Sequence, residues 1–273
     1  MTKVETLERV HDHFHESLNY FKPNNIVFLG LQGSQNYGLD TPFSDVDTKL
    51  IVTPSLHDII MNKQAVSTTH VRENNEHTDF KDIRLMFGTF RKQNLNFLEI
   101  LFTDYFVLNP EYINEWNELI DHREEVAHYN IYSAVKAMKG VALEKYHAME
   151  HRYPAKIEVI DKFGYDPKQL HHLLRVEDYL ARYINGESYQ SCLKPSANLR
   201  EYLVWIKLGG LDLKDARETA DASMQAIEKI CEPFTKESKY NKDNPFIDEL
   251  LDKVQESIMT KSITNELKME NKI

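Results

Sequence analysis

Two short apolar segments joined by a turn-rich stretch constrain the fold of this chain more than any other feature. The first covers residues 25–31 (NIVFLGL) and the second covers residues 45–53 (DVDTKLIVT). Short runs of apolar and β-branched residues bounded by turn residues are typical of buried strands. The stretch between them starts with Gly33-Ser34 and is long enough for one helical turn and a return. The pattern predicts two adjacent strands with a short helical connection.

The rest of the chain divides into a mixed part and a helical part. An amphipathic helix is predicted at residues 3–20, and the second strand is followed by a helix at 55–63, a strand near 76–81 and a helix at 82–93. From about residue 112 the periodicity is helical, with candidate helices at 112–124, 127–150, 166–185, 197–207, 212–231 and 245–268. The predicted fold is therefore α+β: a small mixed sheet with flanking helices at 1–110, then a mostly helical domain at 111–273.

Composition narrows the class of protein. The chain has 273 residues, a formal net charge of −10 and 41% hydrophobic residues. It has neither an apolar run long enough for a transmembrane helix nor a signal-type N-terminus. Its only cysteines, Cys192 and Cys231, form no disulfide framework. We therefore expect a cytoplasmic protein without a membrane partner, and the acidic charge disfavours tight binding of long nucleic acid.

Asp45 and Asp47 are the strongest candidates for chemistry. In a strand, residues two apart point to the same face, so both carboxylates would lie together while Val46 enters the core. Two adjacent carboxylates repel each other unless a cation lies between them. Mg²⁺ is commonly held by carboxylate oxygens together with substrate phosphates. The pair therefore predicts a site for Mg²⁺ or Mn²⁺, where metal ions can activate an attacking oxygen and stabilise the leaving one.

Gly33 and Ser34 directly follow the first predicted strand. A glycine lets the backbone approach a phosphate closely, and the start of a helix presents N–H groups to an anion. The Ser34 hydroxyl adds another donor. The sequence therefore predicts a nucleotide-binding turn that faces the two aspartates.

Taken together, these motifs resemble the DNA polymerase beta-like nucleotidyltransferase superfamily, whose signature is Gly-Ser followed after about nine to thirteen residues by Asp-apolar-Asp. The longer match is similar to a branch of predicted bacterial and phage nucleotidyltransferases, some of them associated with RNA repair. The resemblance extends over about residues 27–210 and rests on these strings: GSQNYG (33–38), SDVD (44–47), NLNFLEILF (94–102), GYDPK (164–168) and HLLR (172–175), followed by Gly186-Glu187.

The resemblance implies a third carboxylate on a later strand. Asp79 is the preferred candidate because it lies within the predicted strand, with His77 and Lys81 on the same face. Asp82 is the alternative, although its position suits a helix N-cap. Glu76 is a further candidate. In the family, the third carboxylate takes the acceptor's proton or holds the catalytic metal.

Lys168, His172 and Arg175 form a second candidate group. Steps of four and three residues place them on one face of a predicted helix whose opposite face is rich in leucine. Such a basic stripe suits the triphosphate of a nucleotide bound between the two domains, with lysine as a point charge and arginine as a planar fork.

The predicted function is metal-dependent transfer of a nucleoside monophosphate from a triphosphate such as ATP to a hydroxyl or phosphate acceptor, with release of pyrophosphate. The acceptor is left open between RNA, protein and a small molecule. Two alternatives remain: a catalytically inactive nucleotide-binding regulatory protein, or an RNA-binding partner that uses the helical domain. The sequence decides neither the base nor the oligomeric state.

Overall fold

The computed structural model describes residues 2–42 and 44–270 and separates into two compact units. The sheet unit contains the described residues of 1–36, 40–129 and 243–273, and the helical unit contains Tyr37–Leu39 and Asn130–Lys242. The chain thus leaves and re-enters the sheet unit twice. The predicted functional division into 1–110 and 111–273 is a different grouping, and it stays a prediction.

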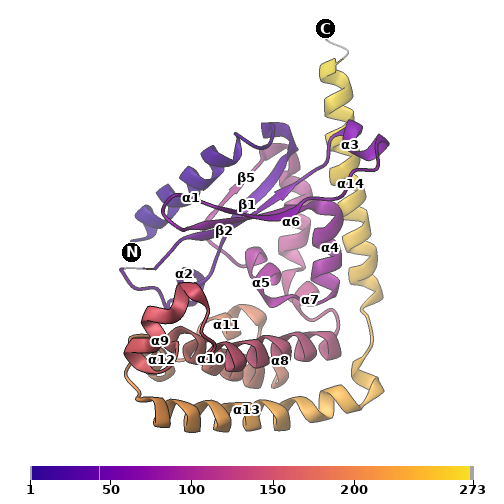
Figure 1. The fold of residues 1–273 in the computed structure, drawn as a ribbon. Coiled ribbons are helices and arrows are strands. Elements are labelled where there is room, and N and C mark those ends of the chain that lie inside the picture. Colours follow the sequence, from indigo (N-terminus) through magenta and orange to yellow (C-terminus); the bar gives the residue numbers. More distant parts are fainter. Residues whose placement is uncertain (1, 43, 271–273) are drawn as a thin grey trace. The chain divides into compact units, whose positions relative to one another are not determined.

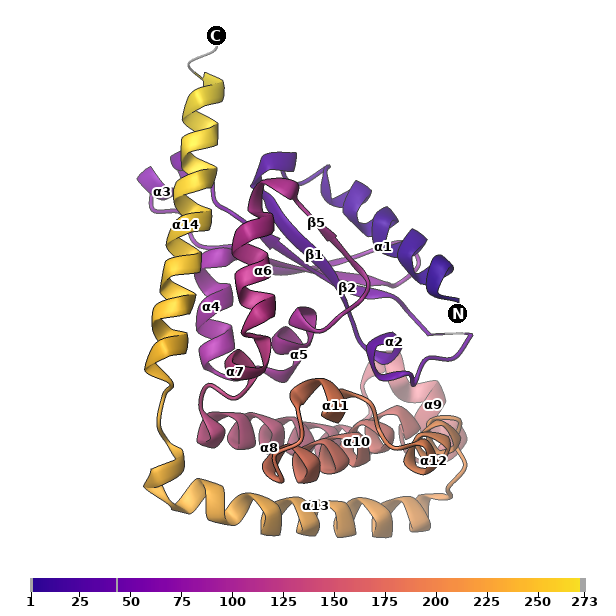
Figure 2. The same ribbon diagram turned by 180° about the vertical axis from the view of Figure 1, so that it is seen from behind.

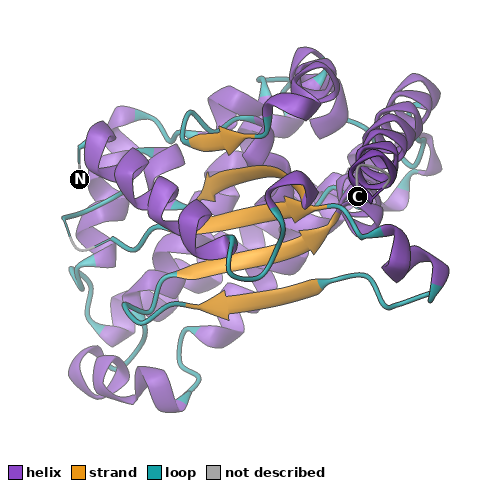
Figure 3. Cartoon of the chain, turned by 90° about the horizontal axis from the view of Figure 1, so that it is seen from above, coloured by secondary structure: helices purple, strands orange, loops and turns teal. Residues whose placement is uncertain are grey.

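The sheet unit is built on five strands: β1 (Ile26–Gln32), β2 (Asp47–Val52), β3 (Ser67–Val71), β4 (His77–Asp82) and β5 (Phe106–Leu108). They lie in the order β3-β4-β2-β1-β5. β2 and β4 run parallel, and the other neighbouring pairs are antiparallel, as the arrow directions in Figure 3 show. The sheet is therefore mixed, which confirms the predicted α+β class.

Helices cover both faces of this sheet. α1 (Lys3–Ser17) starts at a capping box between Thr2 and Glu5 and buries Val10 against Leu29 and Leu50. The opposite face carries the helices α4 (Ile83–Arg91), α5 (Leu95–Leu98), α6 (Ile113–Asp121) and α7 (Arg123–Ala127). The long helix α14 (Pro245–Glu270) returns from the end of the chain and packs beside α4 and α6 (Figures 1 and 2).

The remaining pieces of the sheet unit are short. α2 (Ser34–Tyr37) follows β1, and α3 (Leu56–Ile60) follows β2. β3 and β5 were not predicted. β3 is an exposed edge strand of mostly polar residues and so lacks an apolar pattern, while β5 has only three residues. β2 begins at Asp47 instead of residue 45, so strand alternation alone does not fix the direction of Asp45.

The helical unit contains α8 (Ile131–Ala148), α9 (Ile157–Phe163), α10 (Pro167–Ile184), α11 (Tyr189–Leu193), α12 (Ala197–Lys207) and α13 (Leu213–Lys236). α10 is its centre and packs on α8, α12 and α13. Short 3-10 helices lie at Pro23–Asn25, Glu99–Leu101, Pro110–Tyr112, Pro154–Lys156 and Ser238–Tyr240. Of the helices in the described parts of the chain, none has both the length and the apolar character that crossing a membrane requires.

The GYDPK string has a local structural explanation. Gly164 ends α9 in the left-handed region with φ +81°, where glycine is favoured. Asp166 caps α10 by accepting a hydrogen bond from the Lys168 backbone N–H at 3.0 Å, and Pro167 occupies the first turn. Tyr165 between them is fully buried. This string therefore ends one helix and starts the next.

Candidate active site

The antiparallel pairing of β1 with β2 brings the two predicted motifs to one end of the sheet. Gln32, the last residue of β1, pairs with Asp47, the first residue of β2. Gly33 and Ser34 follow Gln32, and Asp45 precedes Asp47 by two residues. The predicted phosphate turn and the predicted metal ligands are therefore neighbours on adjacent strands, within the sheet unit.

The Asp45–Val46–Asp47 segment is held by its backbone. Val46 is fully buried, whereas Asp45 is exposed and the side chain of Asp47 is 34% exposed. The Asp45 carbonyl accepts from Nε2 of Gln35 at 2.8 Å, and the Val46 N–H donates to Oε1 of Glu76 at 2.8 Å. These bonds fix the main chain and leave the Asp45 carboxylate in solvent.

His77 orients the second aspartate. Oδ1 of Asp47 accepts from the His77 backbone N–H at 3.0 Å and lies 3.2 Å from Nδ1 of the same residue. Within the described part of the chain, no bond to Oδ2 of Asp47 is found. Two carboxylates with accessible oxygens on a fixed backbone match the hard oxygen ligands that Mg²⁺ or Mn²⁺ takes, so these residues fit such an ion.

The glycine turn differs from a ready phosphate cradle. Gly33 has φ +111°, which glycine adopts without strain, and a side chain placed here would meet open space. Its N–H donates to Oε1 of the buried Glu99 at 2.7 Å, so this amide is already bonded. Oγ of Ser34 lies 3.4 Å from Oε1 of Gln35. The Ser34 hydroxyl donates this long, weak bond, so it is more easily redirected to a ligand than the Gly33 amide.

Asp79 lies on the same face of the sheet as Asp47, one step further along. In the parallel β2–β4 register Asp79 pairs with Lys49. Its carboxylate accepts from Nζ of Lys49 at 2.8 Å and from the Thr69 hydroxyl at 2.6 Å. Burial acts to raise the pKa of Asp79, but the charge of Lys49 and its hydrogen bond outweigh burial and hold the pKa below its usual value. Asp79 is therefore ionised at neutral pH.

Lys49 is almost entirely buried, with 3% of its side chain exposed. Its Nζ lies 4.0 Å from the centre of the Phe97 ring in α5, in addition to the ion pair with Asp79. Burial lowers the pKa of Lys49, and the charge of Asp79 opposes that shift. Lys49 was not predicted as a site residue.

The three predicted metal ligands do not form one cluster. Across residues 2–42 and 44–270, no three His, Cys, Asp or Glu side chains are close enough together to hold a metal ion. Asp45 and Asp47 lie on one segment, while Asp79 is paired with Lys49. Since Mg²⁺ often takes only one or two protein carboxylates and fills its other positions with phosphates and water, the geometry suits a two-carboxylate site better than a three-carboxylate site.

Asp82, the alternative third carboxylate, has a structural role. It ends β4 opposite Val52, five residues along β2 from Asp47, or about 17 Å at the usual rise of a strand. Its side chain caps α4 by accepting from the Arg84 N–H at 2.8 Å and pairs with the Arg84 guanidinium at 2.6 Å. Asp82 therefore lies at the opposite end of the strand from the site at Asp47. Its role as a helix N-cap agrees with the sequence prediction.

In the helical unit, the predicted basic stripe exposes less positive charge than expected. Lys168 is exposed. Burial lowers the pKa of His172 well below its usual value, so this side chain is neutral at pH 7. Arg175 is 6% exposed, and its guanidinium lies 3.9 Å from the centre of the Tyr37 ring. The predicted nucleotide-binding role of all three residues remains a prediction.

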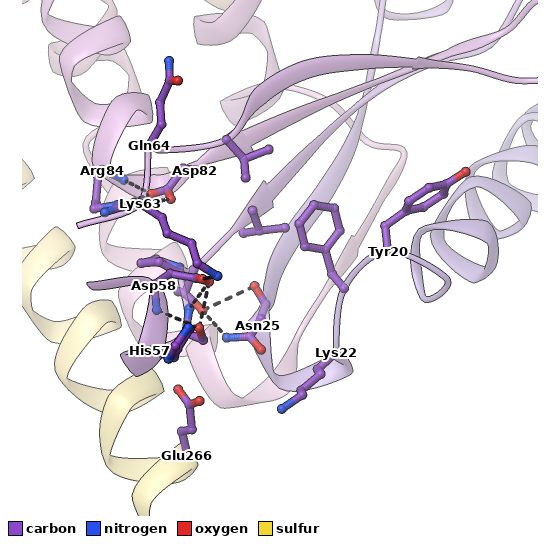
Figure 4. A pocket seen from close by; sticks show the side chains of 16 residues that line it. Tyr20, Lys22, Asn25, His57, Asp58, Lys63, Gln64, Asp82, Arg84 and Glu266 are labelled. Atoms are coloured by element: carbon purple, nitrogen blue, oxygen red, sulfur yellow. Dashed lines mark hydrogen bonds and ion pairs between the residues drawn. The ribbon is translucent and has the colours of Figure 1, made fainter. Parts of the chain in front are cut away.

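A cavity of about 490 Å³ lies at the other end of β2 (Figure 4). Its three lysine or arginine residues are balanced by three carboxylates: Lys22, Lys63 and Arg84 against Asp58, Asp82 and Glu266. Two of the cations are already paired, Lys63 with Asp58 at 2.7 Å and Arg84 with Asp82 at 2.6 Å. A cavity without net positive charge is a poor match for a triphosphate.

Two buried glutamates of the site bond to backbone amides, and these contacts were not predicted from the sequence. Glu76 accepts from the Val46 N–H, and Glu99 accepts from the Gly33 N–H. Glu76 was predicted only as a candidate third carboxylate, and Glu99 was noted only as part of the NLNFLEILF string. A charged residue next to apolar strand residues was the available signal, because glutamate is rarely buried without partners.

Comparisons with known proteins do not identify the function of this chain. No model of a protein family matches the chain, and no curated protein matches it. Among solved structures it is similar to the crystal structure of a nucleotidyltransferase-like protein from Exiguobacterium sibiricum 255-15, with 11% identity and a TM-score of 0.30. The match covers 86% of this chain and 77% of that chain. Similarity at this level says nothing about activity.

Proposed function

We propose that this chain is a metal-dependent nucleotidyltransferase. The observation that supports this proposal best is the Asp45–Val46–Asp47 segment, whose backbone is fixed on both sides while Asp45 is exposed and Asp47 is partly exposed. It starts the strand that pairs with the end of β1, directly before Gly33 and Ser34. Carboxylate oxygens next to a turn with a hydroxyl donor suit a cation that is shared with a triphosphate.

In the proposed reaction, an oxygen of the acceptor attacks the α-phosphorus of a nucleoside triphosphate. The new O–P bond forms as the bond to the β-phosphate oxygen breaks, and pyrophosphate leaves. A bound Mg²⁺ or Mn²⁺ would stabilise the charge on the phosphate oxygens. Asp45 and Asp47 would hold the ion, and Ser34 would donate to a phosphate oxygen.

Asp79 has a separate part in this proposal. It is ionised and lies on the same face as Asp47, so it is the candidate to receive the proton of an acceptor hydroxyl. Its ion pair with Lys49 must then loosen, because a carboxylate that keeps its cation is a weak base. For the helical unit by itself, a nucleotide-binding role of Lys168, His172 and Arg175 is a separate proposal, with His172 as a neutral member of the group.

One observation favours the alternative, a nucleotide-binding regulatory protein without turnover. The Asp79 carboxylate is already matched by Lys49 and Thr69. If that pair does not open, the site can bind a metal and a nucleotide but lacks a base.

Labelled-nucleotide transfer tests the proposal. The protein is incubated with Mg²⁺ or Mn²⁺ and each α-labelled triphosphate, with total RNA and protein extract as acceptors, beside the Asp45→Asn/Asp47→Asn variant. Label transferred only by the native protein supports the enzyme and identifies the base and the acceptor class. Metal-dependent nucleotide binding without transfer supports the regulatory alternative. If the native protein neither binds a nucleotide nor transfers label, the proposal is rejected.

A further inference from the structure

Glu76 precedes β4 and is 1% exposed, yet it has four polar neighbours in the sheet unit besides the Val46 N–H. Its carboxylate forms an ion pair with Arg9 of α1 and lies 3.6 Å from the guanidinium of Arg72. Its Oε2 is 3.1 Å from Nε2 of His13 and accepts from Nδ2 of Asn74 at 2.7 Å. The carboxylate is therefore held from several directions.

The Val46 amide lies outside the hydrogen-bond ladders of the sheet. The β1–β2 ladder begins at Asp47 and the β2–β4 ladder begins at Thr48. The Val46 amide comes just before both, so it has no strand partner and would be buried without a hydrogen bond. Oε1 of Glu76 takes the place of a strand carbonyl, at 2.8 Å. A buried amide without a partner would destabilise the fold.

The next residue extends the same contact. His77 follows Glu76 and donates its backbone N–H to Oδ1 of Asp47 at 3.0 Å. The two consecutive residues thus hold two consecutive residues of the candidate ligand segment: Glu76 holds the Val46 backbone and His77 holds the Asp47 side chain. A change in where Glu76 lies would move both bonds together.

α1 anchors this arrangement from the other face. Nδ1 of the buried His13 lies 2.9 Å from Oγ1 of Thr48 and 3.0 Å from Oγ1 of Thr78. These threonines pair across β2 and β4 directly after the ligand segment. His13 and Arg9 therefore fix Glu76 relative to the start of both strands.

We propose that Glu76 is a positioning residue that sets the spacing of the Asp45 and Asp47 carboxylates for the metal through its bond to the Val46 amide. This inference rests on the proposed function. It assigns Glu76 no contact with the metal or the nucleotide. Residues that support metal ligands in this way typically change metal affinity 10- to 100-fold when they are altered.

Two conservative variants separate the bond from the charge. Glu76→Gln keeps an oxygen that can accept from Val46 but removes the negative charge beside Arg9 and Arg72. Glu76→Asp keeps the charge but shortens the side chain by one methylene and draws the oxygen away from Val46. Glu115→Gln is the matched control. Like Glu76, Glu115 is buried and ion-paired, in its case with Lys261, but it belongs to α6.

The measurement is the Mn²⁺ concentration that half-saturates binding of a fluorescent ATP analogue, together with hydrogen exchange of the Val46 amide. We expect Glu76→Asp to raise the half-saturating Mn²⁺ concentration about 10-fold or more and to speed Val46 exchange. Glu76→Gln should stay within about 3-fold of the native protein in Mn²⁺ dependence, even where its melting temperature falls. Glu115→Gln should leave both readouts unchanged.

The reverse order, with Glu76→Gln impaired and Glu76→Asp unaffected, would overturn the inference, because charge and not the Val46 bond would then matter. Equal effects of the two variants, or none, would overturn it as well. If the native protein showed no Mn²⁺-dependent ATP binding, the proposed function itself would fail, and the inference with it. Native binding with unaffected variants would reject the inference alone.

Discussion

The sheet unit and the helical unit each contain a group of charged residues predicted to belong to a site, and the two groups differ in exposure. The sheet unit has the predicted metal ligands Asp45 and Asp47, and the helical unit has the predicted nucleotide-binding stripe on α10. At the sheet end, Asp45 and Asp47 expose their carboxylates while buried neighbours hold their backbone. On α10, Arg175 is itself buried against Tyr37, and burial keeps His172 neutral.

This difference shows what a charged motif needs in order to bind a ligand. A polar side chain whose hydrogen-bonding capacity is used inside the fold stabilises that fold, while one that faces solvent on a rigid backbone is available to a ligand. By this criterion we expect the aspartates to bind a ligand and most of the α10 stripe to stabilise the fold.

Removing the two aspartate charges should abolish transfer without harming the fold. For Asp45→Asn/Asp47→Asn we expect transfer to fall at least about 1,000-fold, or about 4 kcal/mol of barrier. The urea midpoint should hardly change, because neither charge is buried in an ion pair with lysine or arginine. Initial rates and urea unfolding measure the two effects. Asp12→Asn on the exposed side of α1 is the control. A loss below about 10-fold would show that the pair is not the metal site.

Asp79→Asn should instead lower the stability of the protein, so that it unfolds at a lower urea concentration. It leaves Lys49 buried without its counter-charge, and breaking such a pair destabilises by about 3 kcal/mol. Lys49→Met in the same chain should recover most of that stability, since methionine fills similar space without a charge. Urea unfolding of the native, single and double variants measures the coupling. Transfer that stays absent in the stable double variant would support Asp79 as the base. Restored transfer would show that it only balances Lys49.

These two cases also show how far the sequence could predict the site. The Asp45–Val46–Asp47 string and the Gly33 turn are local patterns, so their place at the end of two adjacent strands could be predicted. The partners of Asp79 are not local. Lys49 and Thr69 reach it from neighbouring strands, and β3, which carries Thr69, has no apolar signal because it is an exposed edge.

The same reason explains why Glu76 and Glu99 were not recognised. Each bonds a backbone amide at least 30 residues away in sequence, Val46 for Glu76 and Gly33 for Glu99. Sequence patterns report periodicity and residue type, and a side chain that replaces a strand carbonyl alters neither. The long helices were predicted well for the converse reason, because α10 carries its own N-cap and apolar face.

Arg175→Ala should destabilise the helical unit more than Lys168→Ala. Arg175 stacks on the Tyr37 ring at 3.9 Å, and a desolvated contact of this kind is worth about 2 kcal/mol. Lys168 is exposed, so its replacement should change stability by less than about 0.5 kcal/mol. Arg175→Lys should not restore stability, because an ammonium lacks the planar face that stacks.

Thermal unfolding and ATP affinity should be measured on the same three variants. A loss of ATP affinity at Arg175 that is larger than its loss of stability would move this residue from the structural group to the ligand-binding group. Equal destabilisation by Lys168→Ala would break the contrast between buried and exposed members of the stripe.

His171, beside His172 on α10, gives the smallest effect and a test by pH alone. Burial lowers its pKa to about 4, although its Nδ1 lies 2.9 Å from the Leu203 carbonyl. In the unfolded chain the pKa is near 6.5. Between pH 6.5 and pH 4 the unfolded state therefore binds more protons, so this histidine makes stability fall as pH drops through that window, with no loss above it.

We expect His171 to make the protein about 1 kcal/mol less stable at pH 5.5 than at pH 7, a difference that His171→Gln should remove because glutamine does not titrate. The urea midpoints of both proteins at the two pH values isolate this histidine from all other groups. An identical pH dependence in the variant would mean that His171 gains a proton without unfolding. The polar interior of the helical unit would then be more accessible to water than the buried state of Arg175 implies, and the contrast with the exposed aspartates would weaken.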